Sequence, residues 1–278
     1  MNLRPILIAM LLIPVGLAPA QTVILKDGRV LAASRVQRSA DQVKLTSATG
    51  AVAEFGMAEI ARIDFPEPPE LGDAAAKVVA GKGEEAAELL ERLVTEQADF
   101  REIPGNWWAL ALLRQAQALE GLGRGLEAQA LSEKLVTQAA DPECVKAAEA
   151  QVAGVLLRRG DLAGASRRVD TVLRDSRGAV ARALAYTVKG QCLLAQEKWE
   201  EAMLAFVQVP VFYPGETIVL PAVMLGRGRA LVGMEDFSSA RAILEELRLA
   251  YPAAPESKLA LQELQRLAAQ EKGANPNR

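Results

Sequence analysis

Histidine is absent from the sequence, and cysteine is nearly so. Histidine is the commonest general base and a frequent zinc ligand, so a chain of 278 residues without one is a poor candidate for an enzyme or a zinc protein. The two cysteines, Cys144 and Cys192, fall at different heights on two predicted helices, which disfavours the short separation that a disulfide needs. We expect two unpaired, buried thiols, no catalysis, no metal and no cofactor.

Aromatic residues and net charge are also scarce. Aromatics make up 4% of the chain and the formal net charge is −3, so neither base stacking nor a basic surface favours a nucleic-acid partner. Half of the residues are apolar, with alanine and leucine prominent, and such a composition favours helices around a sizeable core. We therefore expect a mainly helical protein that binds no nucleic acid.

A long apolar run occurs only at the start of the chain. Residues 1–20 contain one basic residue, Arg4, then an apolar stretch, and they end in Ala18, Pro19 and Ala20. This order is typical of an export signal, whereas a membrane span needs about 20 apolar residues. We predict cleavage after Ala20 and a periplasmic or secreted protein with no transmembrane segment; a retained anchor is the alternative.

The next segment, residues 21–65, alternates apolar and polar residues as strands do. After a first strand, Asp27 and Gly28 suit a tight hairpin turn in which both residues have positive φ. Four further strands are predicted, at residues 30–38, 42–46, 51–55 and 60–65. One helical turn is expected at residues 57–59, and Phe55 is expected in the core. These five short strands predict a small barrel-like module.

The order of these strands resembles SH3-like and Sm-like barrels. The resemblance covers only the architecture, with a single helical turn before the last strand, and it implies a fold. Docking or self-association is the plainest role for such a module.

Residues 66–70 hold three prolines, which predict a stiff, extended linker. Beyond it, residues 71–272 show helical periodicity at a nearly constant spacing. Moving back by 37 residues from Ala202 leads to Ala165 and then to Ala128, each within an apolar stripe. Such a period is the mark of stacked helical hairpins. We expect about five hairpins, a final capping helix, and a loose tail at residues 273–278.

One unit of the array carries the repeat pattern most fully. Gly190, Ala202, Phe206 and Pro214 stand where small, aromatic and proline residues stand in the tetratricopeptide repeat, and the unit resembles that family. The resemblance implies a solenoid whose concave face binds a protein or peptide.

The last repeat has a closer likeness. Residues 240–257, with Leu244, Leu247, Tyr251 and Pro252, resemble repeats of exported proteins associated with the tol–pal system and outer-membrane protein assembly. This resemblance implies a role in the bacterial cell envelope.

Phasing with the family places the first helix of each hairpin on the concave face. The residues then predicted to face a partner are Leu113, Gln117, Leu157, Arg158, Arg159, Thr187, Gln191, Leu225 and Arg229. Arginines near the middle of the array favour an acidic or extended peptide, held by apolar contacts and guanidinium forks; alternatively they form only a solvated surface. Trp107 and Trp108 either anchor a partner or pack in the core.

Two functions fit these observations. The first is an exported, non-catalytic scaffold or adaptor of the bacterial envelope that binds a partner on its concave face. The second is an accessory subunit that self-associates through the β module. An enzyme acting on the cell wall comes third, because no nucleophile lies in a recognised motif and the glycine-rich residues 121–125 and 226–229 do not follow strands as a phosphate loop would.

Overall fold

The computed structural model of the chain describes residues 21–274. The predicted export signal at residues 1–20 lies outside the described residues, as do residues 275–278 of the tail predicted at 273–278. Residues 273 and 274 of that predicted tail are the last residues of the final helix. The chain divides into two compact units, of which one ends at Pro66 and the other is Glu67–Arg278. This division falls at the start of the predicted proline-rich linker.

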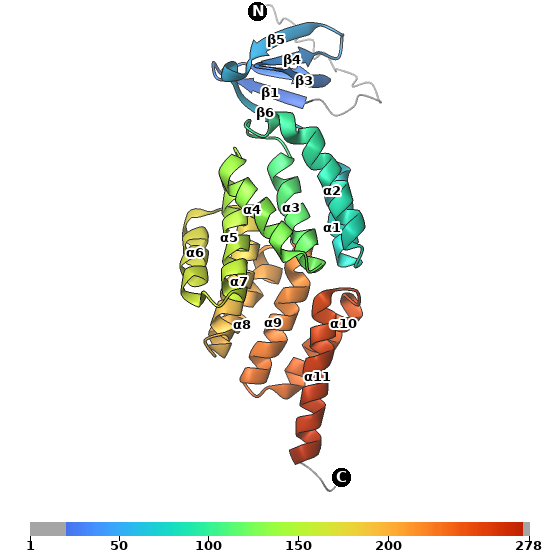
Figure 1. Cartoon of the computed structure of the whole chain (residues 1–278), viewed down its shortest axis with the longest axis vertical. Helices are drawn as coiled ribbons and strands as arrows, with labels where there is room; N and C mark the ends of the chain where they lie inside the picture. Colours follow the sequence, from blue (N-terminus) through green and yellow to red (C-terminus); the bar gives the residue numbers. More distant parts are fainter. Residues whose placement is uncertain (1–20, 275–278) are drawn as a thin grey trace, which may run out of the picture. The chain divides into compact units, whose positions relative to one another are not determined.

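The first unit contains two antiparallel sheets of three strands each (Figure 1). The sheet with the order β2-β1-β6 consists of β2 (Val30–Ala33), β1 (Gln21–Leu25) and β6 (Ile60–Asp64). The sheet with the order β3-β4-β5 consists of β3 (Arg35–Ser39), β4 (Gln42–Thr46) and β5 (Val52–Gly56). A 3-10 turn, η1 (Met57–Glu59), precedes β6 as predicted.

The predicted strand at residues 30–38 is divided at Ser34, so the described part of the unit has six strands where five were predicted. The Ser34 backbone N–H donates to the Thr46 carbonyl at 2.8 Å, and its hydroxyl donates to the same carbonyl at 2.9 Å. The chain therefore passes from one sheet to the other at this residue. The alternation of β1, β4 and β6 buries Val23, Val43 and Ile63. The prediction of a small all-β module is confirmed, and its likeness to SH3-like barrels stays a prediction.

Asp27 and Gly28 do not form the predicted two-residue turn. Of the two, only Gly28 has a positive φ, of 90°. Its N–H donates to the Leu25 carbonyl at 3.0 Å, and the Leu25 N–H donates to the Arg29 carbonyl at 2.9 Å, so the loop is longer and ends in a glycine bulge. The Arg29 guanidinium lies 5.7 Å from the centre of the Phe55 ring. Phe55 is half-buried, so the prediction that it lies in the core is wrong. Its ring is covered by the Arg29 side chain.

The second unit is helical. The structure describes eleven α-helices in it: α1 (Pro69–Val79), α2 (Gly83–Gln97), α3 (Trp108–Gly121), α4 (Gly125–Gln138), α5 (Pro142–Arg158), α6 (Leu162–Asp175), α7 (Ala179–Leu194), α8 (Trp199–Phe212), α9 (Leu220–Gly233), α10 (Phe237–Ala250) and α11 (Pro255–Ala274). Consecutive helices pack as antiparallel hairpins, and α11 follows as a final helix. The predicted helical solenoid after a small β module is confirmed.

Pro68 and Pro69 begin this unit rather than extending a linker. Pro69 is the first residue of α1, and Pro68 is its N-cap. Proline suits the first helical position because its missing N–H would have no partner there. The extended linker is therefore shorter than the predicted residues 66–70.

Small residues set the distance between neighbouring hairpins. The ring of Phe206 on α8 is fully buried and lies against Gly190 on α7 and Gly226 on α9. A Cβ atom at Gly190 would lie 2.6 Å from the nearest ring carbons, and one at Gly226 would lie 2.5 Å from ring carbon Cε2. Both glycines are required because an aromatic ring occupies the space that any side chain would need.

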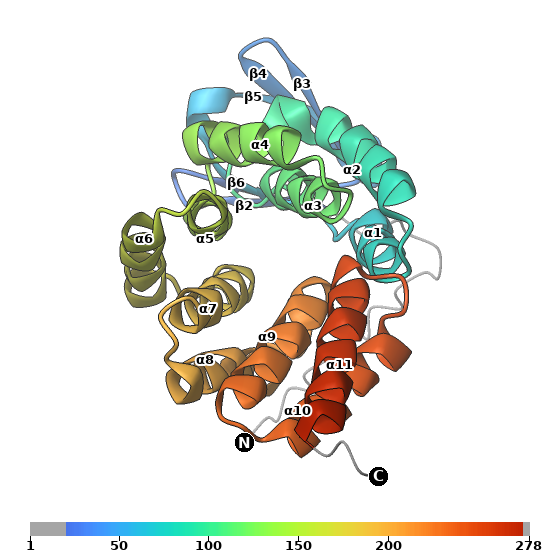
Figure 2. The same cartoon turned by 60° about the horizontal axis from the view of Figure 1, so that its bottom comes forward.

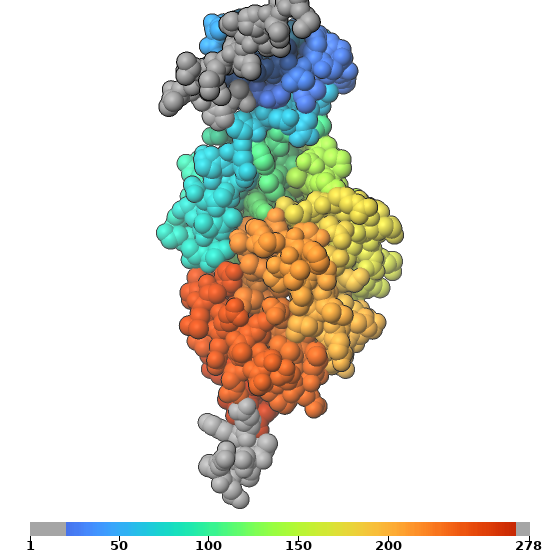
Figure 3. Space-filling view, turned by 180° about the vertical axis from the view of Figure 1, so that it is seen from behind, coloured from blue at the N-terminus to red at the C-terminus, as the bar shows by residue number. Residues whose placement is uncertain are grey.

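The array curves strongly. Each first helix of a hairpin contacts the first helix of the next one, and α9 contacts α11. Figure 2 shows α3, α5, α7 and α9 on the inside of the curve and α4, α6, α8 and α10 on the outside. The turn after α1 reaches the connection between α10 and α11, where a Cβ atom on Gly81 would overlap with Ala253. Figure 3 shows the first hairpin (cyan) directly against the last segments (red-orange), so the two ends of the array meet.

Candidate functional site

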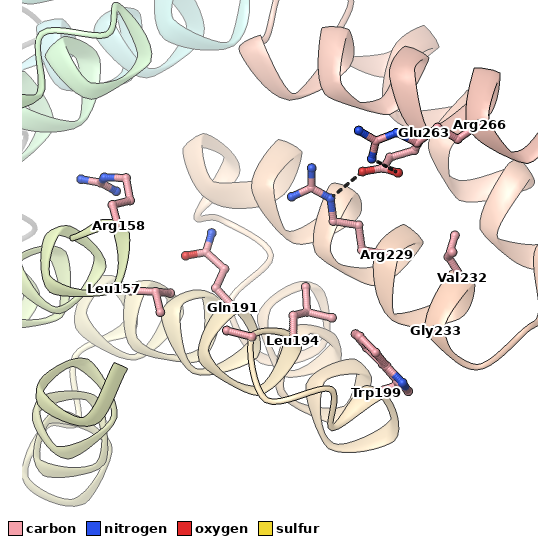
Figure 4. Close-up of a pocket in the computed structure, with 11 residues that line it drawn as sticks. Leu157, Arg158, Gln191, Leu194, Trp199, Arg229, Val232, Gly233, Glu263 and Arg266 are labelled. Atoms are coloured by element: carbon pink, nitrogen blue, oxygen red, sulfur yellow. Dashed lines mark hydrogen bonds and ion pairs between the residues drawn. The ribbon is translucent and has the colours of Figure 1, made fainter. Parts of the chain in front are cut away.

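The inside of the curve contains a cavity of about 810 Å³ near the last turns of the first helices (Figure 4). We call this cavity the groove. The residues that line it are Leu157, Arg158, Gln191, Leu194, Ala195, Trp199, Arg229, Val232, Gly233, Glu263 and Arg266. They come from α5, α7, α9 and α11, and Trp199 is the first residue of α8. The groove therefore spans three hairpins and the final helix.

The lining repeats with the hairpins. Leu157, Leu194 and Val232 follow one another at steps of 37 and then 38 residues and form the first series. Arg158, Ala195 and Gly233 follow at the same steps and form the second. Each of three consecutive first helices thus supplies the same part of its last turn. The first series forms an apolar strip, and a repeated apolar contact suits an extended chain lying across the hairpins.

Trp199 forms an aromatic wall of the groove. Its ring lies over Gly233, where a Cβ atom would be 2.6 Å from ring carbon Cε2. The equivalent positions in the two preceding hairpins hold Arg158 and Ala195. Only the glycine at the end of α9 leaves room for an indole ring at this place.

Arginines stand on both sides of the apolar strip. On the α5 side, Arg158 donates to Glu120 of α3 at 2.5 Å. On the other side, Arg229 Nε donates to Glu263 Oε1 at 3.1 Å, and Arg266 Nη1 donates to Glu263 Oε2 at 3.3 Å, as the dashed lines in Figure 4 show. The groove lining holds three arginines and one glutamate, although the whole chain has a net charge of −3. The lining therefore carries a local excess of positive charge within an acidic chain.

The structure brings four of the nine predicted contact residues together. Leu157, Arg158, Gln191 and Arg229 line the groove. Four others, Leu113, Gln117, Thr187 and Leu225, are buried in the helical unit and offer a partner almost no surface. Arg159 does not line the groove, because its guanidinium donates to Gln129 of α4 at 2.6 Å.

The connection between α8 and α9 covers the rest of the concave face. Its 3-10 turn, η3 (Thr217–Val219), contacts α1, α7 and α9. The preceding Glu216 accepts a hydrogen bond of 2.7 Å from Arg114 on α3, and both side chains are only 13% exposed. Arg114 also donates to Gln117 at 3.0 Å. Part of the inner face is thus filled from within the chain, next to the open groove.

Seven lining residues were not predicted. Four of them, Leu194, Ala195, Val232 and Gly233, follow from the repeat step once Leu157 and Arg158 are placed. Trp199 is the first residue of α8 and follows the hairpin turn directly, so phasing of the first helices gives it no orientation. Glu263 and Arg266 lie on α11, which the sequence marked only as a cap; Glu263 follows Arg229 by 34 residues, a shorter step than the one between earlier hairpins.

The other residues singled out in the sequence have structural roles. Trp108 is buried, and Trp107 packs against the same core, so the two tryptophans support the hairpins. Arg182 Nη1 donates to the Leu173 carbonyl at 2.8 Å, and Arg182 Nε donates to the Tyr213 hydroxyl at 2.7 Å. Arg182, one of the arginines near the middle of the array, therefore ties α7 to α6 and to Tyr213, the residue that follows α8.

The two cysteines are unpaired, as predicted. Burial raises the pKa of the Cys144 thiol to about 12, so this thiol is protonated at neutral pH and is a poor nucleophile. Among the described residues, no three His, Cys, Asp or Glu side chains gather where they could hold a metal ion. No helix in the described part of the chain is long and apolar enough to cross a membrane.

Comparison with known proteins gives only distant likenesses. No protein-family model matches the chain, and no curated protein matches it. A structure of nearly identical TPR-like repeats from a kinesin light chain-like protein of Podosopora anserina is 21% identical, with 65% of this chain and 92% of that chain covered and a TM-score of 0.39. The TPR2AB domain of yeast Sti1, in its complex with pHSP90, is 17% identical, with 72% and 84% covered and a TM-score of 0.33. Likenesses this distant carry no argument about function, which must come from the groove.

Proposed function

We propose that the protein is a non-catalytic scaffold that binds an extended, acidic segment of a partner protein in the groove. The observation that carries the proposal is the lining itself: an apolar strip at the hairpin spacing, an aromatic wall, and arginines on both sides. Acidic side chains of a partner would accept charge-assisted hydrogen bonds from these guanidinium groups. Its apolar side chains would lie against the strip.

The size of the groove agrees with a short segment. Its volume of about 810 Å³ lies within the range of roughly 300–1,000 Å³ in which proteins hold small ligands. A long partner would therefore place only a few residues there. The remaining contacts would have to lie outside the curve.

Neighbouring arginines offer a matched test. Arg158 lines the groove, whereas Arg159 donates to Gln129 of α4, so Arg158→Gln and Arg159→Gln change the net charge equally but only one changes the groove. A fluorescein-labelled peptide of alternating glutamate and leucine serves as the probe, with fluorescence polarisation as the measurement. We expect Arg158→Gln to weaken binding by about three- to tenfold, because Arg158 is exposed, and Arg159→Gln to leave it unchanged. An equal loss in both variants, or no binding by the wild type, would contradict the proposal.

We also propose that the protein is exported and acts in the bacterial cell envelope. The order of residue types at positions 1–20 supports export, and the likeness of residues 240–257 to repeats of the tol–pal type supports the envelope. Mass spectrometry of the protein isolated from a periplasmic fraction tests this directly. The expected first residue is Gln21; an intact Met1 in a cytosolic fraction would contradict it.

Self-association through the β module is the second candidate. Val30 on β2 and Val52 on β5 are 64% and 54% exposed, and both strands lie at sheet edges, where unpaired backbone groups can accept another strand. A charged side chain at such an edge opposes pairing, so Val52→Lys in the full chain should convert an oligomer to a monomer in sedimentation equilibrium. A wild type that is already monomeric would exclude this function.

A further inference from the structure

Glu263 stands out among the groove residues because it is the one acidic side chain in the lining. It belongs to α11, and its side chain is only 14% exposed. One oxygen accepts from Arg229 on α9 and the other from Arg266 on α11. Both oxygens therefore engage the two guanidinium groups that flank the α11 side of the groove (Figure 4).

The two arginines remain accessible from the groove. Arg229 and Arg266 are 43% and 71% exposed, and each retains N–H groups beyond the one that binds Glu263. A carboxylate that enters the groove from solvent would find its strongest donors here. It would also come close to the carboxylate that is already bound.

We propose that Glu263 is a resident competitor for the carboxylate of the ligand, so that it determines how strongly the groove prefers acidic segments. This inference rests on the proposed function. An incoming carboxylate must share Arg229 and Arg266 with Glu263, and two like charges within a few ångströms repel each other. Acidic segments then bind weakly and exchange readily, and the apolar strip supplies the remaining selectivity.

A purely structural role for Glu263 makes a different prediction. If Glu263 only ties α11 to α9, loss of its charge lowers the melting temperature and leaves peptide affinity the same or weaker. If Glu263 competes, loss of its charge strengthens binding of acidic peptides. The sign of the change in affinity separates the two roles.

Glu263→Gln is the variant of choice because it keeps the shape of the side chain and removes its charge. Glu246→Gln is the matched control, since Glu246 is an exposed residue of α10 that does not line the groove and its substitution changes the net charge equally. The probes are the labelled peptide of alternating glutamate and leucine and a neutral peptide with glutamine in place of each glutamate. We expect Glu263→Gln to bind the acidic peptide about tenfold more tightly at low salt, a gain that shrinks as the Debye length falls with added salt.

The outcomes separate this inference from the proposed function. A gain for the acidic peptide alone, absent from Glu246→Gln, supports competition. Two results overturn the inference while the proposed function stands: Glu263→Gln binds the acidic peptide as tightly as the wild type does, or Glu263→Gln gains equally in affinity for the neutral peptide. Failure of the wild type and of Glu263→Gln to bind either peptide overturns both.

Arg266→Gln gives an independent measurement if Glu263→Gln proves unstable. Arg266 is largely exposed and lies on the final helix, so its substitution should hardly disturb folding. It should weaken the acidic peptide several-fold and leave the neutral peptide unchanged. An unchanged affinity for the acidic peptide would mean that ligand carboxylates do not use the arginines that Glu263 holds, and the inference would fall.

Discussion

Replacement of Gly226 by alanine should destabilise the helical unit even though alanine is the better helix former. Gly226 lies inside α9, against the fully buried ring of Phe206. An added Cβ would lie 2.5 Å from ring carbon Cε2, whereas carbon atoms in contact prefer about 3.5–4.0 Å. The ring cannot simply retreat, because Gly190 of α7 lies against it as well.

The magnitude follows from two opposing terms. Alanine gains about 1 kcal/mol over glycine in a helix interior. Overpacking a close-packed core costs about 1–3 kcal/mol or more, and the upper end applies here because the ring is enclosed by two helices. We expect a net loss of about 2 kcal/mol, which lowers the melting temperature of a unit of this size by about 4–8 °C.

Gly72→Ala is the matched control. Gly72 lies within α1, and a Cβ there would meet nothing within 4 Å, so only the gain in helix propensity remains and the melting temperature should rise slightly. Melting temperatures are measured by circular dichroism for both single variants and for the double variant Gly226→Ala with Phe206→Leu, in which the ring that Gly226 accommodates is removed. A Gly226→Ala protein as stable as the wild type, or a double variant whose losses simply add, would refute the packing argument.

Two further predictions concern buried charge. Burial opposes ionisation of Glu143, but hydrogen bonds from the Ser176 hydroxyl and from the Arg177 and Gly178 amides outweigh it and hold its pKa below the usual 4.5. The ionised carboxylate thus stabilises the fold above pH 4.5, and this contribution is lost as the pH falls through the lower folded-state pKa. The difference in unfolding free energy between the wild type and Glu143→Gln should therefore shrink below pH 4.5. A difference that stays constant with pH would contradict this. Arg114→Met should cost about 3 kcal/mol in urea unfolding, because it leaves the buried Glu216 without its partner, and adding Glu216→Leu should restore part of the loss.

The hairpins could be predicted from sequence because the information is local. Apolar residues at helical spacing, glycine-rich turns and N-cap aspartates such as Asp161 and Asp236 each specify a helix or its end within a few residues. The same holds for the strands of the β module. The division of the second predicted strand at Ser34 could not be predicted. It depends on where the two sheets diverge and on a backbone hydrogen bond from Ser34 to Thr46, twelve residues away.

The groove could be predicted only in part for the same reason. Repeat phasing predicts the side of each first helix that faces inward, and Leu157, Gln191 and Arg229 from that prediction line the groove. It cannot tell that η3 fills the neighbouring region, because the ion pair between Arg114 and Glu216 joins residues 102 positions apart. Gln117, which was predicted to face a partner, is buried and accepts a hydrogen bond from Arg114, the arginine of that ion pair.

Small residues connect the sequence to the size of the groove. The inner helices carry many buried alanines, including Ala111, Ala116, Ala147, Ala150, Ala153, Ala181 and Ala185. Short side chains let these helices approach closely on the inside while the outer helices spread apart, so each hairpin adds much curvature. The curve then closes where Gly81 meets Ala253, and the enclosed space is narrow enough for one connection to fill part of it. The small buried residues of the first helices thus accompany a short groove, which suits the short segment that we propose it binds.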